Sequence, residues 1–290
     1  MIGNSKQRGL ALLAIAVGIA FPATRVHGAL ALYSTMDDID IVGTAVQDET
    51  FPAEDGVLQS NVTTGIAGQI GQAIDANTTG TAASVSYGNV LNPGSTDMTA
   101  MLWFNADSVK SQFLARKGNS GSGDEGWSLS LESRNSGEFL RVFGRVNATG
   151  VASNADRALL LKDFDSNTST GVWHHVALVM HAAGSIELFV DGSTAGITPN
   201  VWGDTFTVDA NGISNTSSLL LGVGTGSGTD IKMDDFSIFN EALSAESIAT
   251  IYGNGLNGIG ANVPEPSALI AMLCGVGFTV IVGKRRIASC

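Results

Sequence analysis

Short runs of aliphatic, aromatic and β-branched residues recur along the middle of the chain, and Gly, Asn, Asp or Ser bounds each of them. The runs are residues 98–104, 113–115, 127–131, 139–146, 176–180, 186–190 and 219–223. Two of them, WSLSL at 127–131 and IELFV at 186–190, alternate as strands with one buried face do. Short runs bounded by turn-forming residues predict many β-strands.

One helix is expected close to the end of this region. Ser244 is a natural N-cap for a helix over 245–252, and Gly253 ends it. Leu243 and Ile248 have the spacing of a hydrophobic staple across the helix start. Many short strands followed by one late helix predict an all-β fold, a two-sheet antiparallel sandwich.

The first 28 residues have the order of a secretory signal peptide. Two basic residues precede the apolar run 10–21, and small residues follow it. The apolar run is too short to span a bilayer, which disfavours a permanent membrane helix. Cleavage after Gly28 and cleavage after Ala31 both fit the pattern. We therefore expect the chain to be exported.

The last 27 residues have three parts. Pro264, Glu265 and Pro266 come first, the apolar run 268–283 follows, and a basic cluster containing Arg285 and Arg286 comes near the end. As a helix the apolar run rises about 24 Å, just short of a comfortable bilayer crossing. A basic cluster is retained on the cytoplasmic side. The tail is therefore expected to halt export while anchoring weakly.

The order of Pro-Glu-Pro turn, apolar helix and arginine-rich end resembles the PEP-CTERM sorting signal of diderm bacteria. The resemblance implies recognition and cleavage by exosortase, an integral-membrane cysteine protease. It also implies transient residence in the inner membrane, followed by delivery to the outer surface or the extracellular matrix. The expected organisation is a signal peptide (1–28), a folded domain (29–255), a linker (256–263) and the sorting signal (264–290).

Removal of the two ends leaves a strongly acidic region. Residues 29–263 carry 9 basic and 26 acidic side chains, a net charge of −17, so the basic footprint of a nucleic-acid-binding protein is absent. Both cysteines, Cys274 and Cys290, lie in the tail. The folded region therefore has no disulfide, and its stability must come from packing, alone or with a bound metal ion.

Six segments in order resemble the LamG-like, concanavalin A-type jelly-roll domain. They are residues 98–104 (MTAMLWF), 113–118 (FLARKG), 126–129 (GWSL), 171–179 (GVWHHVALV), 187–192 (ELFVDG) and 233–244 (MDDFSIFNEALS). The resemblance covers about residues 30–255 and is strongest from residue 97 onward. It implies two curved antiparallel sheets, and it implies no particular activity, because this fold hosts many.

Trp202 is the candidate ligand-binding residue. Pro199, Asn200 and Gly203 flank it, so we expect it in a loop, where its ring would serve as an exposed platform for stacking a sugar. The other tryptophans, Trp103, Trp127 and Trp173, fall in or beside predicted strands and are expected in the core.

Four aspartates are candidate calcium ligands. In LamG-like jelly rolls the first and last strands run near each other, so the resemblance implies that Asp37 or Asp38 could meet Asp234 or Asp235. Calcium takes six to eight oxygen ligands, and an acidic domain without disulfides would gain from such a bridge. The alternative is that Asp234 and Asp235 form a solvated strand edge and Asp37 caps a turn.

Two further motifs have structural interpretations. His174 and His175 are neighbours in a strand, so they should point to opposite faces and cannot share one metal ion. Asp191 and Gly192 follow an alternating strand and predict a hairpin turn.

Catalytic patterns are missing from the sequence. A glycosidase needs two carboxylates across a cleft, yet no alternating run of acids occurs, nor a serine nucleophile elbow or a zinc-binding His-Glu-x-x-His. The chain is therefore predicted not to be an enzyme. Two functions stay open: a module that binds carbohydrate or exopolysaccharide, and a structural or adhesive surface protein that binds other proteins.

The tail generates the first prediction. We expect processing near residues 264–267, because the Pro-Glu-Pro turn precedes a marginal helix with a basic end. Intact-mass measurement on the protein recovered from its host should give a species that lacks Cys274. A mature mass that still includes Cys274 would exclude the processing.

Overall fold

The computed structural model describes residues 30–50, 52–92, 94, 96–118, 125–148, 156–208, 213 and 215–261. The expected signal peptide and sorting signal, with its apolar run 268–283, lie outside these residues. No helix formed by the described residues is long and apolar enough to cross a membrane.

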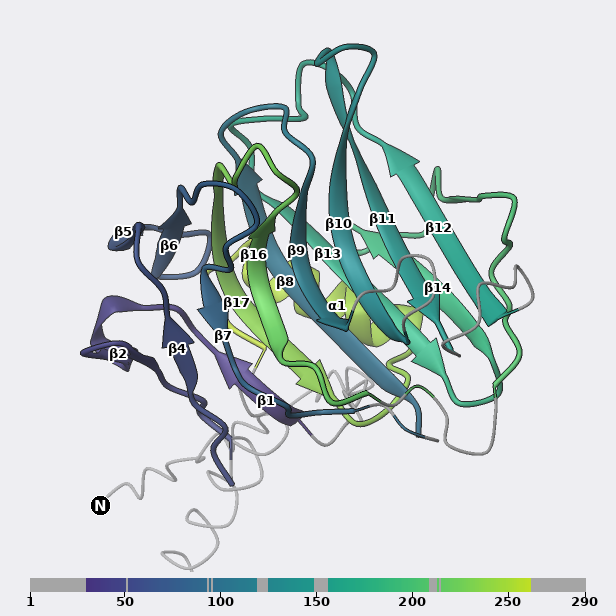
Figure 1. Ribbon diagram of the computed structural model, residues 1–290, viewed down its shortest axis with the longest axis horizontal. Helices are drawn as coiled ribbons and strands as arrows, with labels where there is room; N and C mark the ends of the chain where they lie inside the picture. Colours follow the sequence, from purple (N-terminus) through teal and green to yellow (C-terminus); the bar gives the residue numbers. More distant parts are fainter. Residues whose placement is uncertain are drawn as a thin grey trace, which may run out of the picture. The chain divides into compact units, whose positions relative to one another are not determined.

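Two antiparallel sheets face each other (Figure 1). The seven-stranded sheet has the order β14 (Ser185–Val190), β13 (His174–His181), β8 (Met98–Ala106), β17 (Ile231–Phe239), β6 (Gln72–Ala76) and β5 (Val62–Ala67), with β1 (Leu30–Ser34) also paired to β17. The ten-stranded sheet has the order β15 (Thr198–Pro199), β12 (Arg157–Asp163), β11 (Phe139–Asn147), β10 (Gly126–Arg134), β9 (Gln112–Gly118), β16 (Leu219–Gly224), β7 (Val85–Ser86), β4 (Gly56–Leu58), β3 (Ala45–Val46) and β2 (Ile41–Val42). The predicted all-β, two-sheet sandwich is confirmed.

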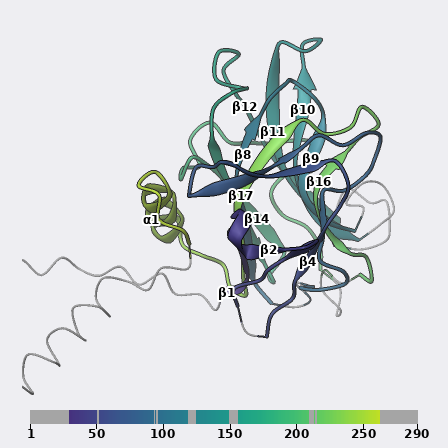
Figure 2. The same cartoon turned by 90° about the vertical axis from the view of Figure 1, so that its left-hand side faces the viewer.

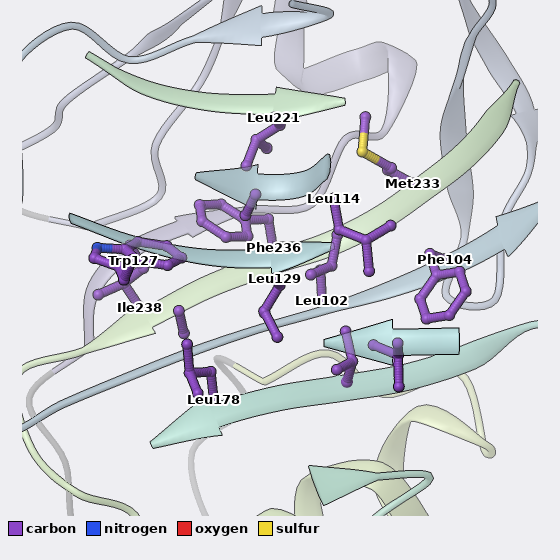
Figure 3. Packing of buried hydrophobic residues seen from close by; sticks show 14 of the residues in the cluster. Leu102, Phe104, Leu114, Trp127, Leu129, Leu178, Leu221, Met233, Phe236 and Ile238 are labelled. Carbon is purple, nitrogen blue, oxygen red and sulfur yellow. The ribbon is translucent and has the colours of Figure 1, made fainter. Parts of the chain in front are cut away.

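Apolar side chains at every second position of the strands pack together between the two sheets and form the core. Trp127 and Leu129 of β10 point inward from one sheet, and Leu102, Leu178 and Phe236 do so from the other (Figure 3). All five side chains are fully buried. The alternation seen in WSLSL therefore corresponds to one face on this core, as predicted.

The helix α1 (Ala245–Gly255) packs on the outer face of the seven-stranded sheet (Figure 2). Its side chains Ile248 and Ile251 join a second buried cluster with Phe189 and Phe239 of that sheet. Within the described residues, no helix covers the outer face of the ten-stranded sheet. That face is the open one.

The helix start was predicted correctly and its end was not. The Ser244 side chain accepts a hydrogen bond from the Ser247 amide, as an N-cap does. The helix continues past Gly253 to Gly255, where a Cβ atom would lie 2.6 Å from the Trp103 ring. Glycine at 255 thus allows the last turn to approach the sheet closely.

The other tryptophans divide between different surroundings. Trp127 lies between the sheets as predicted. Trp103 is equally buried but on the outer face of the seven-stranded sheet, where its ring stacks on Tyr252 of α1 with centroids 5.4 Å apart. Trp173 precedes β13 and is half-buried, so the prediction of a core position is wrong for it.

Candidate functional site

Strand β11 shows which side chains reach the open face. Leu140, Val142 and Val146 belong to the core between the sheets. The alternate residues Phe143 and Arg145 therefore project from the outer face of the ten-stranded sheet. The registers of β9, β10 and β12 against β11 extend this outer layer across four strands.

A groove of about 260 Å³ lies on this open face. Its lining is Ser111, Gln112, Phe113, Ser130, Leu131, Glu132, Phe143, Arg145, Leu159 and Thr225. Ser130 pairs with Phe113 on one side and with Phe143 on the other, so a serine hydroxyl lies between two phenylalanine rings. The groove combines flat apolar walls with hydroxyl, amide and charged groups.

Two ion pairs occupy one part of the open face. The Arg141 guanidinium donates to both carboxylate oxygens of Asp163, at 2.5 and 2.9 Å. This hydrogen bonding raises the pKa of Arg141 and lowers the pKa of Asp163 against the opposing effect of burial. Arg134 lies 3.1 Å from Glu132, the carboxylate that lines the groove. These charges are therefore balanced locally.

Arg116, Arg145 and Arg157 lie further along the same strands. Burial lowers the pKa of Arg116, and burial followed by the neighbouring charge of Arg157 lowers the pKa of Arg145. Arg157 is only 5% exposed, and its Nε and Nη2 atoms have no hydrogen-bond partner in the described part of the chain. Buried guanidinium groups without such partners are costly.

Trp202 lies in a turn beside this arginine cluster. The turn is held by a hydrogen bond from the Gly203 amide to the Asn200 carbonyl, and the Leu159 amide of β12 donates to Gly203. The predicted loop position is confirmed. The ring is half-buried and covers the guanidinium of Arg157, whose Cζ lies 5.2 Å from the ring centroid. Its role as a sugar platform stays a prediction.

The structure also brings together three of the four predicted calcium ligands. Asp234 and Asp235 of β17 are both buried, and the negative charge of Asp37 acts on both. Asp38 is not among the charges that shift their pKa values; its carboxylate accepts a hydrogen bond from the Thr64 hydroxyl at 2.6 Å.

These carboxylates hold local backbone. Asp234 Oδ2 accepts from the Ile70 amide at 2.8 Å, and Asp37 Oδ1 accepts from the Gln72 amide at 2.5 Å. Both amides belong to the turn and strand start that join β5 to β6. Asp235 accepts from the Tyr33 hydroxyl of β1 and, at 3.3 Å, from the Ala261 amide. The cluster thus connects the first strand, the last strand and the chain beyond α1.

The alternative of a solvated strand edge is wrong for Asp234 and Asp235. Strand β17 lies inside the sheet, between β8 on one side and β6 and β1 on the other. The register against β8 shifts between Asp234 and Ser237, and Asp235 has a φ of +53°. This bulge turns two adjacent aspartates into the interior instead of exposing one of them.

The pKa values of Asp234 and Asp235 are both raised, and burial is the largest cause. It raises the pKa of Asp234 to about 8, with further increases from Asp235 and Asp37. It also raises the pKa of Asp235 to about 6, and Asp37 adds to the increase. Burial and the Asp235 charge raise the pKa of Tyr33 as well.

Calcium binding stays a prediction. Among the described residues, no three Asp, Glu, His or Cys side chains stand in an arrangement that could hold a metal ion. The donor chemistry nevertheless suits calcium, because Asp234 Oδ1 is a buried carboxylate oxygen that has no hydrogen-bond partner in the part of the chain that the structure describes. A bound ion would require the carboxylates of Asp37 and Asp234 to turn partly away from the backbone amides that now donate hydrogen bonds to them.

The two histidines behave as the strand pattern predicts. His174 contacts Phe104 and Phe164 on the core side, whereas His175 contacts Trp103 on the outer side. The turn at Asp191 and Gly192 is confirmed too.

Asp191 and Gly192 both have positive φ, and Val190 and Ser193 exchange backbone hydrogen bonds. Asp191 also accepts from His174 Nδ1 at 2.9 Å and from the His175 amide at 3.0 Å. Its carboxylate is thereby committed to holding the hairpin.

Sequence reasoning missed the arginine-lined face. The signal is present in β11, where residues 139, 141, 143 and 145 read Phe, Arg, Phe, Arg at every second position. A period of two places these side chains on one face of a strand. Which face is open follows only from the position of α1 on the other sheet.

Comparisons with known proteins agree with the fold. A family model described as the concanavalin A-like lectin/glucanases superfamily matches residues 77–249. No functionally curated protein matches the sequence.

Three solved structures illustrate the structural likeness. The binding domain of Paraclostridial Mosquitocidal Protein 1 has a TM-score of 0.55 at 14% identity, over 77% of this chain and 51% of that one. The receptor binding domain of botulinum neurotoxin D has a TM-score of 0.53 at 14% identity, over 78% and 52%. The botulinum neurotoxin serotype D ligand binding domain in complex with N-acetylneuraminic acid has a TM-score of 0.55 at 14% identity, over 78% and 50%. This chain spans about half the length of those chains, and identity this low establishes the fold alone.

The buried aspartates generate a prediction about pH. In the unfolded chain Asp234 ionises near its usual pKa of 3.8, whereas in the folded chain it keeps its proton up to about pH 8. Between these values the folded state binds more protons, so stability should fall as the pH rises from about 4 to about 8. With a chelator present, Asp234→Asn should reduce this loss of stability with rising pH. The variant should therefore have a higher melting temperature than the wild type at pH 8, and the difference should disappear near pH 4.

Asp204→Asn is the control, because Asp204 is an exposed aspartate for which a neutral amide should change little. Melting temperatures measured across this pH range should run parallel for the control and the wild type. Parallel curves for Asp234→Asn and the wild type would contradict the assignment.

Proposed function

This chain belongs to the concanavalin A-like lectin/glucanases superfamily, and from that premise we propose that it is a non-catalytic module that binds glycans on the open face of its ten-stranded sheet. The observation that carries the proposal is the groove between Phe113 and Phe143. Sugar rings present C–H faces that pack on aromatic rings, and hydroxyl groups that exchange hydrogen bonds with polar side chains. Ser130 and Arg145 line the groove with such groups.

The likeness to toxin binding domains supports this choice. They include a receptor binding domain and a ligand binding domain, the latter in complex with N-acetylneuraminic acid. These proteins share the fold at low identity, so they support the class of function and not the position of a site.

The composition of the groove supports a binding role without catalysis. Hydrolysis of a glycosidic bond generally uses two carboxylates separated by about 5 to 10 Å. Glu132 is the one carboxylate among the described residues that line the groove, and it forms an ion pair with Arg134.

The module would act outside the cell. The predicted signal peptide and the PEP-CTERM-like tail favour export, cleavage by exosortase, and residence at the outer surface or in the extracellular matrix. Exopolysaccharide is abundant at such a location. The residues proposed to be recognised by exosortase are Pro264, Glu265, Pro266, Arg285 and Arg286.

Calcium is proposed to stabilise the module rather than to touch the glycan. Asp37, Asp234 and Asp235 would hold it, and its charge would offset the repulsion among these carboxylates. At about a hundred times its dissociation constant, calcium should stabilise the fold by about 2.7 kcal/mol. Denaturant unfolding in calcium and in chelator measures this increment.

Asp37→Asn and Asp234→Asn should each lose the calcium increment, whereas Asp204→Asn should keep it. Unfolding curves of the wild type that coincide in calcium and in chelator would rule out the site and would leave glycan binding untouched.

Glycan binding itself has a direct test. The full chain should bind at least one class of polysaccharide on a glycan array, with an affinity measurable by calorimetry. Phe143→Ala should weaken that binding about fivefold or more, because it removes one wall of the groove. Phe139→Ala is the matched control, since Phe139 shares the strand and face but does not line the groove.

A result of no binding across neutral and acidic polysaccharides would reject the proposal. The remaining alternative would then be a structural or adhesive surface protein that binds other proteins.

A further inference from the structure

The arginines of the folded region are gathered on one face of an otherwise acidic domain. Residues 29–263 contain nine basic side chains against 26 acidic ones. The five arginines all project from the outer face of strands β9 to β12: Arg116, Arg134, Arg141, Arg145 and Arg157. The four lysines lie elsewhere; Lys110 and Lys232, for example, pair with Asp230 and Asp107. Positive groups gathered on one face of an acidic domain raise the local potential there and attract anions.

The register separates the arginines into two groups. Arg134 and Arg141 form the ion pairs described above. Ser128 of β10 pairs with Arg116 of β9 on one side and with Arg145 of β11 on the other. Arg157 lies on the next strand, opposite Asn147 and therefore diagonal to Arg145. Three guanidinium-bearing residues thus lie around Ser128, at the opposite end of the open face from Arg134 and Arg141.

Two of these three arginines have buried donor atoms that lack a hydrogen-bond partner in the described part of the chain. Arg157 is 5% exposed, and its Nε and Nη2 atoms lack a hydrogen-bond partner in the described part of the chain. Within the same residues, the buried Nε of Arg116 lacks one too. Its Cζ lies 5.0 Å from the centroid of the Phe113 ring, which walls the groove. These two guanidinium groups therefore act on the groove through their positive charge, which favours an anion there.

We infer that the groove binds an acidic polysaccharide, with the ring of an acidic sugar between Phe113 and Phe143 and its carboxylate or sulfate at Arg145, reinforced by Arg157 and Arg116. This inference rests on the proposed glycan-binding function and specifies its ligand class. Arg145 lines the groove directly, and the positive charge of Arg157 beside it lowers its pKa. A bound acidic group relieves that repulsion, whereas a neutral sugar does not. The geometry therefore selects for charge as well as for shape.

The experiment compares polysaccharides with the same backbone and different charge. Binding of the full chain is measured by calorimetry to polygalacturonate and to its methyl ester, and to dextran sulfate and dextran. The first pair tests the carboxylate and the second tests the sulfate. We expect an acidic member to bind at least about tenfold more tightly than its neutral counterpart, because hydrogen bonds between ionised partners are about twice as strong as those between neutral groups. Binding should also weaken as salt is added.

Variants locate the site on the open face. Arg145→Gln should weaken binding of the preferred acidic polymer about tenfold or more, and Arg157→Gln should weaken it similarly. Arg145→Lys should lose part of the affinity, since it keeps the charge without the planar fork of donors. Lys232→Gln, which removes a positive charge on the other sheet, should bind as the wild type does. Melting temperatures show whether each variant is folded. If Arg157→Gln does not fold, Arg145→Lys still tests the site.

The outcomes separate the two hypotheses. Equal binding of both members of each pair, or preference for the neutral members, would overturn the acidic-ligand inference and leave glycan binding standing. Acidic binding that survives both arginine-to-glutamine changes would also overturn it, because the site would lie elsewhere. Failure to bind these four polymers and every glycan on the array would reject both this inference and the proposed function.

Discussion

The structure depends on the pairing of β17 inside the seven-stranded sheet. This strand comes from the end of the folded region, yet it pairs with β8 on one side and with β6 and β1 on the other. Phe236 and Ile238 of β17 enter the core, and Phe239 reaches the cluster under α1. Without residues 231–239 the sheet would be cut into two parts. Closure of the sandwich therefore joins segments about 200 residues apart, which raises the entropic cost of the transition state for folding.

The bulge in this strand gathers acidic groups that ordinary sheet geometry would separate. Desolvation opposes ionisation of Asp234 and Asp235, and the same carboxylates hold the β5–β6 turn, Tyr33 and Ala261 in place. The domain thus uses costly buried groups to connect its first strand, its last strand and the residues after α1. The outer face of the other sheet has the opposite character, since its buried charges are positive.

The sequence was most informative where one face of a strand is buried. All seven predicted runs are strands, because alternation or a continuous apolar run marks each of them. The strands β2, β3, β4 and β7 have two or three residues each, too few to show any period. The end of α1 was misplaced because Gly255, which approaches Trp103, looks in sequence like any other glycine. The first and last strands pair, as the family resemblance implied, but the burial of Asp234 and Asp235 depends on a bulge that no local pattern reveals. The arginine cluster needed the register of four strands, which is a property of tertiary structure.

The separation of lysines from arginines has a practical consequence. Reagents that couple to primary amines modify lysines and leave guanidinium groups intact. Lys117 is buried and donates to Asn89 and Ser217, and Lys110 and Lys232 lie beside Asp230 and Asp107. Lys162 pairs in register with the inward-facing Val142. Attachment through Lys110, Lys162 or Lys232 would therefore immobilise the domain without chemically altering the guanidinium groups of the arginine-lined face, whereas the buried Lys117 would stay unmodified.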